Sequence, residues 1–457
     1  MPAQLATAVA TVERWAATAP ELGGDFTADS TAATAYWGRG TELLADLPDR
    51  PERTPEQQAL ARAVHTAGRR LRRGFVHRHG DRLHDELTDG GRALARLPEL
   101  AYGAAELVPG LTPGRETVAA ELTHSQPAKE GWEADQGVLF WGLLRSARSG
   151  GRIQRAMLRP TSRAQRLLPG FRRSGTADLG VVTLDRRGTA GHITVRNLSC
   201  LNAEDNTLAE DLETAVDLVL LDDDLKVGVV RGAPMTHPRY LDRRVFNAGI
   251  NLTDLYHGRI SLVDFLLRRE LGYISKIIHG LDVTDPAEGP DPAVPEVREK
   301  PWIAAVDTFA IGGGMQLALA FDHVVADPAA YFSLPAVQEG IIPGAANFRL
   351  SRILGPRLAR QVILGGRKIH ATDPEARLLC DEVVETERID AAVDAAADWL
   401  QAPSVVSNRR MLNLVDEPLG QFREYLARFA LEQSERLYAE DVMEILERTW
   451  IKRGGRG

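Results

Sequence analysis

The chain has 457 residues, of which 44% are hydrophobic and 26% are charged, and its formal net charge is −8. This is the composition of a globular protein with room for two or three domains, and the negative charge gives no general attraction to nucleic acid. No stretch approaches the ~20 apolar residues of a transmembrane helix, and Glu13 and Arg14 interrupt the apolar run that a signal peptide would need. We therefore expect a cytoplasmic protein.

Residues 1–157 have the apolar spacing of helices. Leu5, Val9 and Val12 recur at intervals of three or four residues, and Pro and Gly breakers divide the region into several helices. Residues 158–178 contain Pro, Gly, Ser and many arginines with little periodicity, which predicts a linker.

From Leu179 onward, short β-type runs alternate with helical stretches, and this alternation predicts an α/β fold. The β-type runs are residues 181–185, 192–197, 225–231, 302–306 and 323–326. An acidic, proline-rich stretch at residues 284–301 predicts an exposed loop, and the chain beyond residue 400 has the pattern of mixed-charge helices.

Gly312, Gly313 and Gly314 stand between a β-type run and the apolar helical segment 315–321. Glycines at such a junction let the backbone approach a ligand and leave amide N–H groups pointing out of the new helix. These amides suit a negative charge that develops on a carbonyl oxygen. A glycine run alone is a weak signal, but the segment RRVFNAGINLTDL at 243–255 offers a partner. Together the two segments predict a split oxyanion hole.

This pair of segments resembles the crotonase (enoyl-CoA hydratase/isomerase) superfamily, whose members hold an acyl-CoA thioester carbonyl between two backbone N–H groups. Carried over by position, the donors are the amides of Ile250 and Gly313. Three further segments are similar to the family, namely residues 196–220, 225–233 and 331–355. The resemblance covers residues 176–400 and implies an α/β core built as a spiral of ββα turns.

The acid/base positions depart from the family pattern. Hydratases of this family carry one glutamate shortly after the glycine run and another just after the proline of a later loop. Here those positions are Gln316 and Ala336. Neither side chain exchanges a proton near neutral pH, so water addition is not expected. Gln316 packs within its helix or, facing the thioester, serves as a neutral hydrogen-bonding group.

One branch of the superfamily is similar in this departure and in its long N-terminal extension, and residues 235–277 resemble it throughout. Its members are cofactor-independent dioxygenases that act on an arylacetyl-CoA thioester and supply a precursor of vancomycin-type antibiotics. The resemblance implies O2 as a co-substrate, CoA as part of the substrate and no metal or other cofactor. It also implies a homotrimer or a dimer of trimers.

The resemblance assigns two charged side chains to the substrate ring. Glu204 is either an acid that stabilises the N-terminus of a helix or a carboxylate that accepts a hydrogen bond from a ring hydroxyl. Arg269 is either part of a solvated helix face together with Arg268 or a phenol-binding residue. No single base stands out, although Glu204 is a candidate.

Other positions are assigned to substrate contacts by the same resemblance. A loop that precedes the first oxyanion segment is expected to bind CoA, with Arg239 suited to phosphate; its residues are His237, Pro238, Arg239 and Tyr240. The oxyanion segment adds Ala248, Gly249, Asn251 and Leu252 as substrate contacts. A dry apolar pocket for oxygen and the carbanion is expected to be lined by Ala336, Ile341 and Ile342.

Three histidines and two cysteines raise the question of a metal site or a disulfide. His77, His79 and His84 lie close in sequence, but Gly80 interrupts them and no carboxylate or cysteine completes a ligand spacing, so we expect no metal site. The two cysteines, Cys200 and Cys380, are expected to be reduced thiols.

The sequence thus predicts an N-terminal helical domain with linker (1–175), an α/β core (176–400) and a C-terminal helical lid or oligomerisation segment (401–457). Two other functions stay open. One is another CoA-thioester reaction such as hydrolysis, isomerisation or decarboxylation. The other is a non-catalytic relative that binds acyl-CoA or RNA, although an RNA-binding protein would need a basic surface that this sequence does not indicate.

Overall fold

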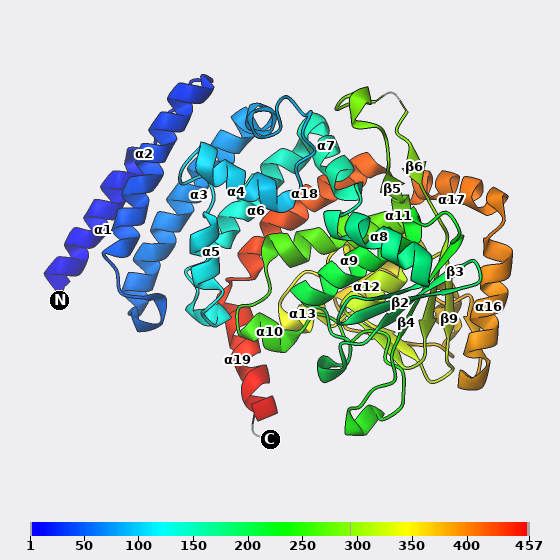
Figure 1. The fold of residues 1–457 in the computed structure, drawn as a ribbon. Helices are drawn as coiled ribbons and strands as arrows, with labels where there is room; N and C mark the ends of the chain where they lie inside the picture. Colours follow the sequence, from blue (N-terminus) through cyan, green and yellow to red (C-terminus); the bar gives the residue numbers. More distant parts are fainter. Residues whose placement is uncertain (1, 293, 455–457) are drawn as a thin grey trace.

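A computed structural model describes residues 2–292 and 294–454 of the chain, and Figure 1 shows a helical N-terminal region beside an α/β core. The prediction of an α/β core between N-terminal and C-terminal helices is confirmed. The N-terminal helices are α1 (Pro2–Ala17), α2 (Phe26–Ala45), α3 (Pro55–Leu87), α4 (Leu97–Leu107), α5 (Arg115–Glu121), α6 (Glu133–Arg145) and α7 (Ala147–Leu158).

The expected linker is instead regular structure. It forms helix α8 (Ser162–Ser174) and strand β1 (Thr176–Asp178). The Thr161 side chain accepts a hydrogen bond from the helix amide of Ala164, and the helix ends at a left-handed glycine. Ala164 and Phe171 are buried on one face, so two apolar residues a helical interval apart are enough to anchor a helix that is otherwise rich in arginine.

The larger sheet has seven strands in the order β1-β2-β3-β4-β7-β9-β12. β1, β2 and β3 pair antiparallel, and every later pair is parallel. After β1, its strands are β2 (Val182–Arg187), β3 (Ala190–Val195), β4 (Val227–Gly232), β7 (Trp302–Val306), β9 (His323–Ala326) and β12 (Glu382–Val383). Helix α9 (Asn206–Leu221) covers one face. Helix α16 (Ile389–Leu400) packs on the other, against strand residues such as Val229 and Ile303.

A smaller sheet of β11-β10-β8 lies beside the larger one. Its strands are β8 (Phe309–Ile311), β10 (Tyr331–Ser333) and β11 (Ile369–His370), and the helices after β8 and β10 are α12 (Gly313–Ala318), α13 (Ala336–Glu339), α14 (Ala346–Ile353) and α15 (Gly355–Ile363). Each turn of the chain adds one strand to the large sheet, one to the small sheet, and then a helix: β7-β8-α12 is followed by β9-β10-α13. The expected ββα spiral therefore places the start of α12 where the two sheets meet.

Three helices complete the chain, α17 (Pro403–Asp416), α18 (Leu419–Arg436) and α19 (Glu440–Gly454). In Figure 1, α18 runs between the N-terminal helices and the core. A Cβ placed on Gly137 of α6 would lie 2.0 Å from Oγ of Ser434 on α18, so glycine is required for this close helix contact. Two shorter helices are α10 (Leu252–Tyr256) and α11 (Ser275–His279), and β5 (Leu281–Asp282) pairs with β6 (Val297–Arg298).

The histidines and cysteines noted in the sequence have ordinary surroundings. Nε2 of His79 lies 2.7 Å from a carboxylate oxygen of Asp29, and His84 contacts a threonine hydroxyl. Cys200 and Cys380 are free thiols, and burial raises their pKa values to about 11 and about 12. Within the described residues, no helix has the length and apolar character needed to cross a membrane.

Candidate active site

The two glycine loops expected to form the oxyanion hole are in contact. Gly249 has φ +90° and Gly312 has φ +53°, a conformation that residues with a side chain rarely adopt. A Cβ placed on Gly249 would lie 3.2 Å from the carbonyl oxygen of Ile311 and 3.5 Å from Cα of Gly312. Both loops therefore depend on glycine for their backbone conformation and for their close approach.

The amides of Ile250 and Gly313 are available as donors. The amide of Glu204 donates to the carbonyl of Gly249 at 2.7 Å, and the amide of Asn251 donates to the carbonyl of Glu204 at 2.8 Å. The intervening Ile250 N–H must lie on the opposite edge of this loop. Gly313 is the first residue of α12, where amides have no intrahelical acceptor. Of the hydrogen bonds among the described residues, none uses either amide, and both residues line one pocket.

Arg269 lies beside this pair and is only 3% exposed. Its five N–H groups all have acceptors: two oxygens of Glu204 at 2.5 and 3.3 Å, Oε1 of Glu270 at 2.7 Å, Oε1 of Gln316 at 2.7 Å and the carbonyl of Gly313 at 2.6 Å. Burial alone would lower the pKa of Arg269, but the neighbouring Glu204 and Glu270 outweigh burial and raise it. Arg269 is thus a fixed cation that joins the ring-binding candidate, the glutamine and the second oxyanion loop.

Glu204 stands just before α9 rather than within it. Asp205 is the N-cap of that helix, since its side chain accepts from the amide of Leu208, whereas the Glu204 carboxylate accepts from Arg269, Asn247 and Tyr273. Glu204 is 1% exposed and lines the pocket. Oε1 of Glu204 accepts from Nδ2 of Asn247 at 2.9 Å and from the Tyr273 hydroxyl at 3.3 Å. Burial raises the pKa of Tyr273 well above its ordinary value, which keeps that hydroxyl a donor.

Arg269 and Tyr273 lie on a segment with unusual helical geometry, defined here as the π segment, residues 262–274. The runs Leu262–Leu267 and Glu270–Ile274 are assigned as π-helical, and the second is kinked at Gly272, whose φ of −91° and ψ of −111° are not helical. π-helical turns are rare and frequently occur at functional sites. The two adjacent arginines of this segment point to different partners, as neighbouring residues on a helix do. Arg268 is not on a solvated face as one interpretation held: it is half-buried, and its Nε donates to Glu213 at 2.7 Å.

Glu213 fixes the π segment from behind the pocket. Its fully buried carboxylate also accepts from Lys276 at 2.8 Å and from Arg96 of the N-terminal region at 2.5 Å. Burial alone would raise the pKa of Glu213, but Lys276 and the two arginines lower it. The negative charge of Glu213 is thus matched by cations from the π segment, from α11 and from the N-terminal helices.

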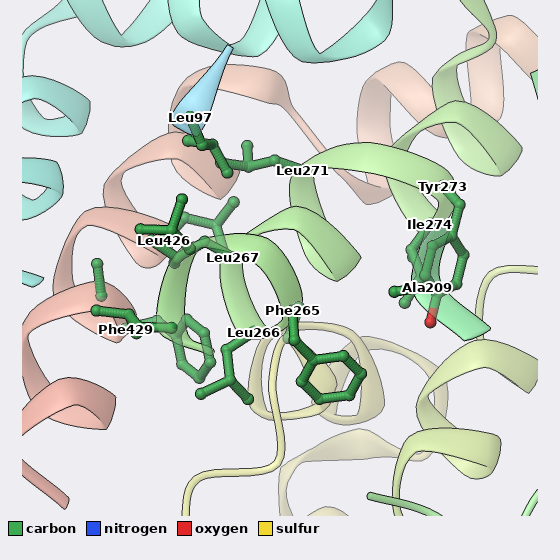
Figure 2. Close-up of a cluster of buried hydrophobic side chains, with 14 of the residues drawn as sticks. Leu97, Ala209, Phe265, Leu266, Leu267, Leu271, Tyr273, Ile274, Leu426 and Phe429 are labelled. Atoms are coloured by element: carbon green, nitrogen blue, oxygen red, sulfur yellow. The ribbon is translucent and has the colours of Figure 1, made fainter. Parts of the chain in front are cut away.

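The N-terminal helices contact the π segment but do not line the pocket. Among the described residues, the first in the chain to line it is Glu204. Oε1 of Glu133 in α6 accepts from the amide of Leu262 at 3.1 Å, at the start of the π segment. Figure 2 shows Leu97 of α4 beside Leu271 of the π segment. The N-terminal helices therefore act on the site through the segment that carries Arg269.

Helix α18 closes the other side of the pocket. Phe429 lines it, and Figure 2 shows Phe429 and Leu426 of α18 next to the π segment. The Tyr425 hydroxyl donates to the carbonyl of Gly344, and the Gln433 side chain accepts from the amide of Ile342 at 2.9 Å. These contacts hold the loop opposite the glycines. Between them the pocket is lined mostly by apolar residues, with one carboxylate side chain, Glu339; the apolar residues include Phe265, Leu266, Ala336, Ile341, Ile342 and Pro343.

The structure brings most, but not all, of the predicted residues to this pocket. Those that line it are Glu204, Ala248, Gly249, Ile250, Arg269, Gly313, Gln316, Ala336 and Ile341. Asn251 and Leu252 do not: the Asn251 side chain caps α10, and Leu252 is the first residue of that helix. The loop of His237, Pro238, Arg239 and Tyr240 lies outside the pocket, with the Tyr240 ring 5.4 Å from that of Phe309.

Sequence reasoning missed four polar residues of the site: Asn247, Glu270, Tyr273 and Glu339, the last of which lines the pocket. Glu270 binds Arg269 and also accepts from Arg349 at 3.1 Å. One signal was available, because the charged residues of LLRREL interrupt an otherwise apolar stretch, and charges inside a buried helix are almost always paired. Within the described residues, no three His, Cys, Asp or Glu side chains gather as metal ligands.

Known proteins resemble this chain over its core and, in one case, over nearly its whole length. Residues 296–420 match the sequence model of the enoyl-CoA hydratase/isomerase family. The (3,5-dihydroxyphenyl)acetyl-CoA 1,2-dioxygenase of Amycolatopsis orientalis is 52% identical over 405 residues, which cover 89% of this chain and 92% of that protein. A probable enoyl-CoA hydratase of Rhizobium meliloti is 30% identical over 215 residues, which cover 47% of this chain and 72% of that protein.

Among solved structures, a carnitinyl-CoA hydratase from Mycobacterium avium aligns with 60% of this chain and 96% of its own, at 27% identity and a TM-score of 0.48. The alignment with the Amycolatopsis protein is too long to be confined to the core, so it reaches into the N-terminal helices, whereas the alignment with the Rhizobium hydratase covers 47% of the chain. On that likeness the chain belongs to the enoyl-CoA hydratase/isomerase (crotonase) family.

Proposed function

We propose that the protein is a dioxygenase that converts (3,5-dihydroxyphenyl)acetyl-CoA and O2 into 3,5-dihydroxyphenylglyoxylate and CoA. The observation that carries this proposal is a pair of unused amides, Ile250 and Gly313, in a pocket where Gln316 and Ala336 occupy the family's acid/base positions. The site can stabilise a thioester enolate but has no glutamates at those positions to add water. The 52% identity to the Amycolatopsis dioxygenase supports the same reaction.

The proposed reaction begins with the thioester oxygen between the two amides. Loss of one α-proton gives an enolate whose charge spreads into the dihydroxyphenyl ring. This electron-rich carbanion passes one electron to O2, and recombination forms a C–O bond and a peroxide at the α-carbon. The terminal peroxide oxygen attacks the thioester carbonyl and CoA thiolate leaves. Cleavage of the O–O bond with loss of the second α-hydrogen gives the α-keto acid, and all three of its side-chain oxygens are accounted for by one carbonyl and one O2.

Ring recognition is assigned to Glu204 with Arg269 behind it. The five N–H groups of Arg269 are all engaged by protein oxygens, so its part in phenol binding is to hold the Glu204 carboxylate that accepts a ring hydroxyl. Oε1 of Gln316 accepts a hydrogen bond from Arg269. The side-chain nitrogen of Gln316 then remains as a neutral donor beside the enolate. Ala336 and Ile341, with the phenyl rings of the lining, keep water away from the carbanion.

We further propose that no metal or other cofactor takes part, that the loop of His237–Tyr240 contacts CoA, and that the location is cytoplasmic. Arg239 is exposed and suits a phosphate, and the two free thiols fit a reducing compartment. We assign one role to each part of the chain: residues 1–175 support the π segment, residues 176–400 form the site, and residues 401–457 close it. The resemblance also implies that the product is a precursor of dihydroxyphenylglycine, an amino acid of vancomycin-type antibiotics.

The test of the reaction is oxygen uptake by enzyme that has been stripped of metals with a chelator. We expect one O2 consumed per CoA released from (3,5-dihydroxyphenyl)acetyl-CoA, and no CoA release under strict anaerobiosis. An unchanged rate of CoA release without oxygen would identify a thioesterase instead, and binding of the thioester without any turnover would identify a non-catalytic relative.

We also propose a homotrimer, or two stacked trimers, and α17 supports an interface. Its exposed apolar side chains include Met411 (60% exposed), Leu412 (62%), Leu414 (64%) and Val415 (73%). Contiguous exposed apolar surface of this kind marks interaction sites. The two roles expected for the C-terminal segment therefore belong to different helices. α18 packs against the pocket inside the subunit with one face buried, and α17 is available to a second copy.

Replacing Leu412 and Val415 together by aspartate is expected to convert the assembly into 50.0 kDa monomers, because each buried carboxylate would have to be desolvated in the interface. The measurement is the molar mass by light scattering after gel filtration. Ala32→Asp on the exposed surface of α2 is the matched control and should leave the mass unchanged. A double variant with the wild-type mass would rule out α17 as the interface.

A further inference from the structure

Asn247 occupies the junction between the ring-binding carboxylate and the first oxyanion loop. It is 2% exposed. Its main chain is tied to β8, because the Ile311 amide donates to the carbonyl of Asn247 at 3.0 Å. A Cβ placed on Gly314 would lie 2.7 Å from Cβ of Asn247. The backbone of this residue is therefore clamped between the strand and the helix that carry the second donor, Gly313.

The side chain of Asn247 makes two hydrogen bonds in opposite directions. Oδ1 accepts from the amide of Gly249 at 2.7 Å, and Nδ2 donates to Oε1 of Glu204 at 2.9 Å. The reverse orientation of the amide would set acceptor against acceptor and donor against donor, so the network allows one orientation only. A single rigid plane thus spans the distance between the Glu204 carboxylate and the Gly249 main chain.

This geometry determines where the Ile250 N–H points. The carbonyl of Gly249 accepts from the amide of Glu204 at 2.7 Å. In a trans peptide the N–H of the next residue points away from that carbonyl, so Ile250 N–H is directed to the opposite side. The Asn247 side chain binds the amide of Gly249, and the Glu204 amide binds its carbonyl. Because glycine has no side chain to restrict its backbone, these two hydrogen bonds fix the conformation of Gly249 at φ +90°.

We propose that Asn247 is a positioning residue that couples ring recognition at Glu204 to the direction of the Ile250 donor. The proposal rests on the proposed function for the substrate contacts, but the coupling itself is a property of the protein. When a ring hydroxyl pulls on Glu204, Asn247 transmits the position of that carboxylate to the oxyanion loop. A substrate that lacks the hydroxyl does not fix the Glu204 carboxylate in this way, so the Ile250 N–H is directed less accurately at its thioester oxygen.

Asn247→Asp provides the test because it keeps the shape and the Oδ1 acceptor but replaces the donor with a carboxylate oxygen facing Glu204. Two carboxylates at this distance share one proton, and the pKa of that proton is strongly raised. The other charged and titratable groups that face the pair are Arg269 and Tyr273, with Glu270 beyond the arginine. When the shared proton is present, the new carboxyl donates to Glu204 as the amide did; when it is lost, the two groups repel.

We expect the kcat of Asn247→Asp to fall by about 10- to 100-fold near pH 9 and to recover to within about fivefold of wild type near pH 6. The KM for the thioester should change much less, because the CoA contacts lie elsewhere. Asn247→Leu loses both hydrogen bonds and should have low kcat at both pH values. Each rate is scaled to the folded fraction measured by circular dichroism, which separates positioning from stability.

Gln126→Glu is the matched control. Gln126 is equally buried, its Nε2 donates to the carbonyl of Leu437 at 3.0 Å, and neither residue lines the pocket. This variant also buries a carboxyl where a donor is needed, so its stability should depend on pH, but the kcat of its folded fraction should not. Equal pH dependence of kcat in both variants, or wild-type kcat of Asn247→Asp at both pH values, would overturn the proposal.

A readout without turnover keeps the inference separate from the proposed reaction. In protein labelled with 15N-isoleucine, the amide resonance of Ile250 should titrate in Asn247→Asp and stay constant in wild type and Gln126→Glu. If wild type consumes no oxygen but this titration is seen, the proposed reaction fails and the positioning role stands. If the resonance does not titrate, the positioning role is wrong whatever the enzyme does with oxygen.

Discussion

Replacement of Gly313 by alanine is expected to lower kcat by about 10²–10³-fold, the usual loss when one oxyanion donor is misplaced. The Cβ of alanine would lie 2.2 Å from Oε2 of Glu204 and 3.2 Å from Nη2 of Arg269. Neither neighbour can move freely, because Arg269 has all five donors engaged. The start of α12 must therefore shift, and its amide turns away from the thioester oxygen. Steady-state oxygen uptake measures the effect.

Gly151→Ala is the control for this substitution. Gly151 lies inside α7, and a Cβ there would meet nothing within 4 Å. Alanine should raise the stability by about 0.5–1 kcal/mol because it reduces the freedom of the unfolded chain, and kcat should not change. If Gly313→Ala folds with the thermal midpoint of wild type and keeps wild-type kcat, the Gly313 amide is not an oxyanion donor.

Replacement of Arg269 by methionine is expected to destabilise the protein by about 3–5 kcal/mol, the typical result of removing one member of a buried ion network. Glu204 and Glu270 are each 1% exposed and would be left without their common cation. Urea unfolding monitored by tryptophan fluorescence measures the loss. In the folded fraction, turnover of the dihydroxyphenyl thioester should fall far more than turnover of phenylacetyl-CoA, because Glu204 is no longer held for the ring hydroxyl.

Two further variants separate these effects. Arg62→Met removes an ion pair with Glu440 whose side chains are 53% and 72% exposed, and it should cost no more than about 1 kcal/mol. Combining Arg269→Met with Glu204→Gln should restore part of the stability, because one buried charge disappears with its partner, while ring discrimination stays lost. Equal losses on both substrates after Arg269→Met would remove the ring-binding role of the pair.

Much of the fold follows from local pattern. The runs at 302–306 and 323–326 were predicted with the bounds that β7 and β9 have, because apolar stretches of four or five residues have the length of buried strands and are short for helices. The stretch 158–178 was misread, since its helix α8 carries four arginines and a proline around two buried residues. There the core contact, rather than periodicity, decides the helix.

The site divides in the same way. The glycines of both loops and the side chains at positions 316 and 336 could be identified by spacing and resemblance. Asn247, Glu270 and Tyr273 could not, because asparagine, glutamate and tyrosine are common residues whose roles depend on what they face. The π geometry of residues 262–274 was equally hidden, and so were its contacts with distant segments: Glu133 of α6 accepts from the amide of Leu262, and Glu213 of α9 accepts from Arg268.

The amino-acid sequence by itself determined the conformations that only glycine tolerates at Gly249 and Gly312, and with them two backbone donors at fixed places. It also excluded proton exchange at Gln316 and Ala336. Only the tertiary structure decided that Arg269 is saturated by Glu204 and three other acceptors and that Asn247 spans two loops. The physical reason is that backbone conformation is set within a few residues, whereas the partners of a buried polar side chain are whichever groups folding brings within about 3 Å.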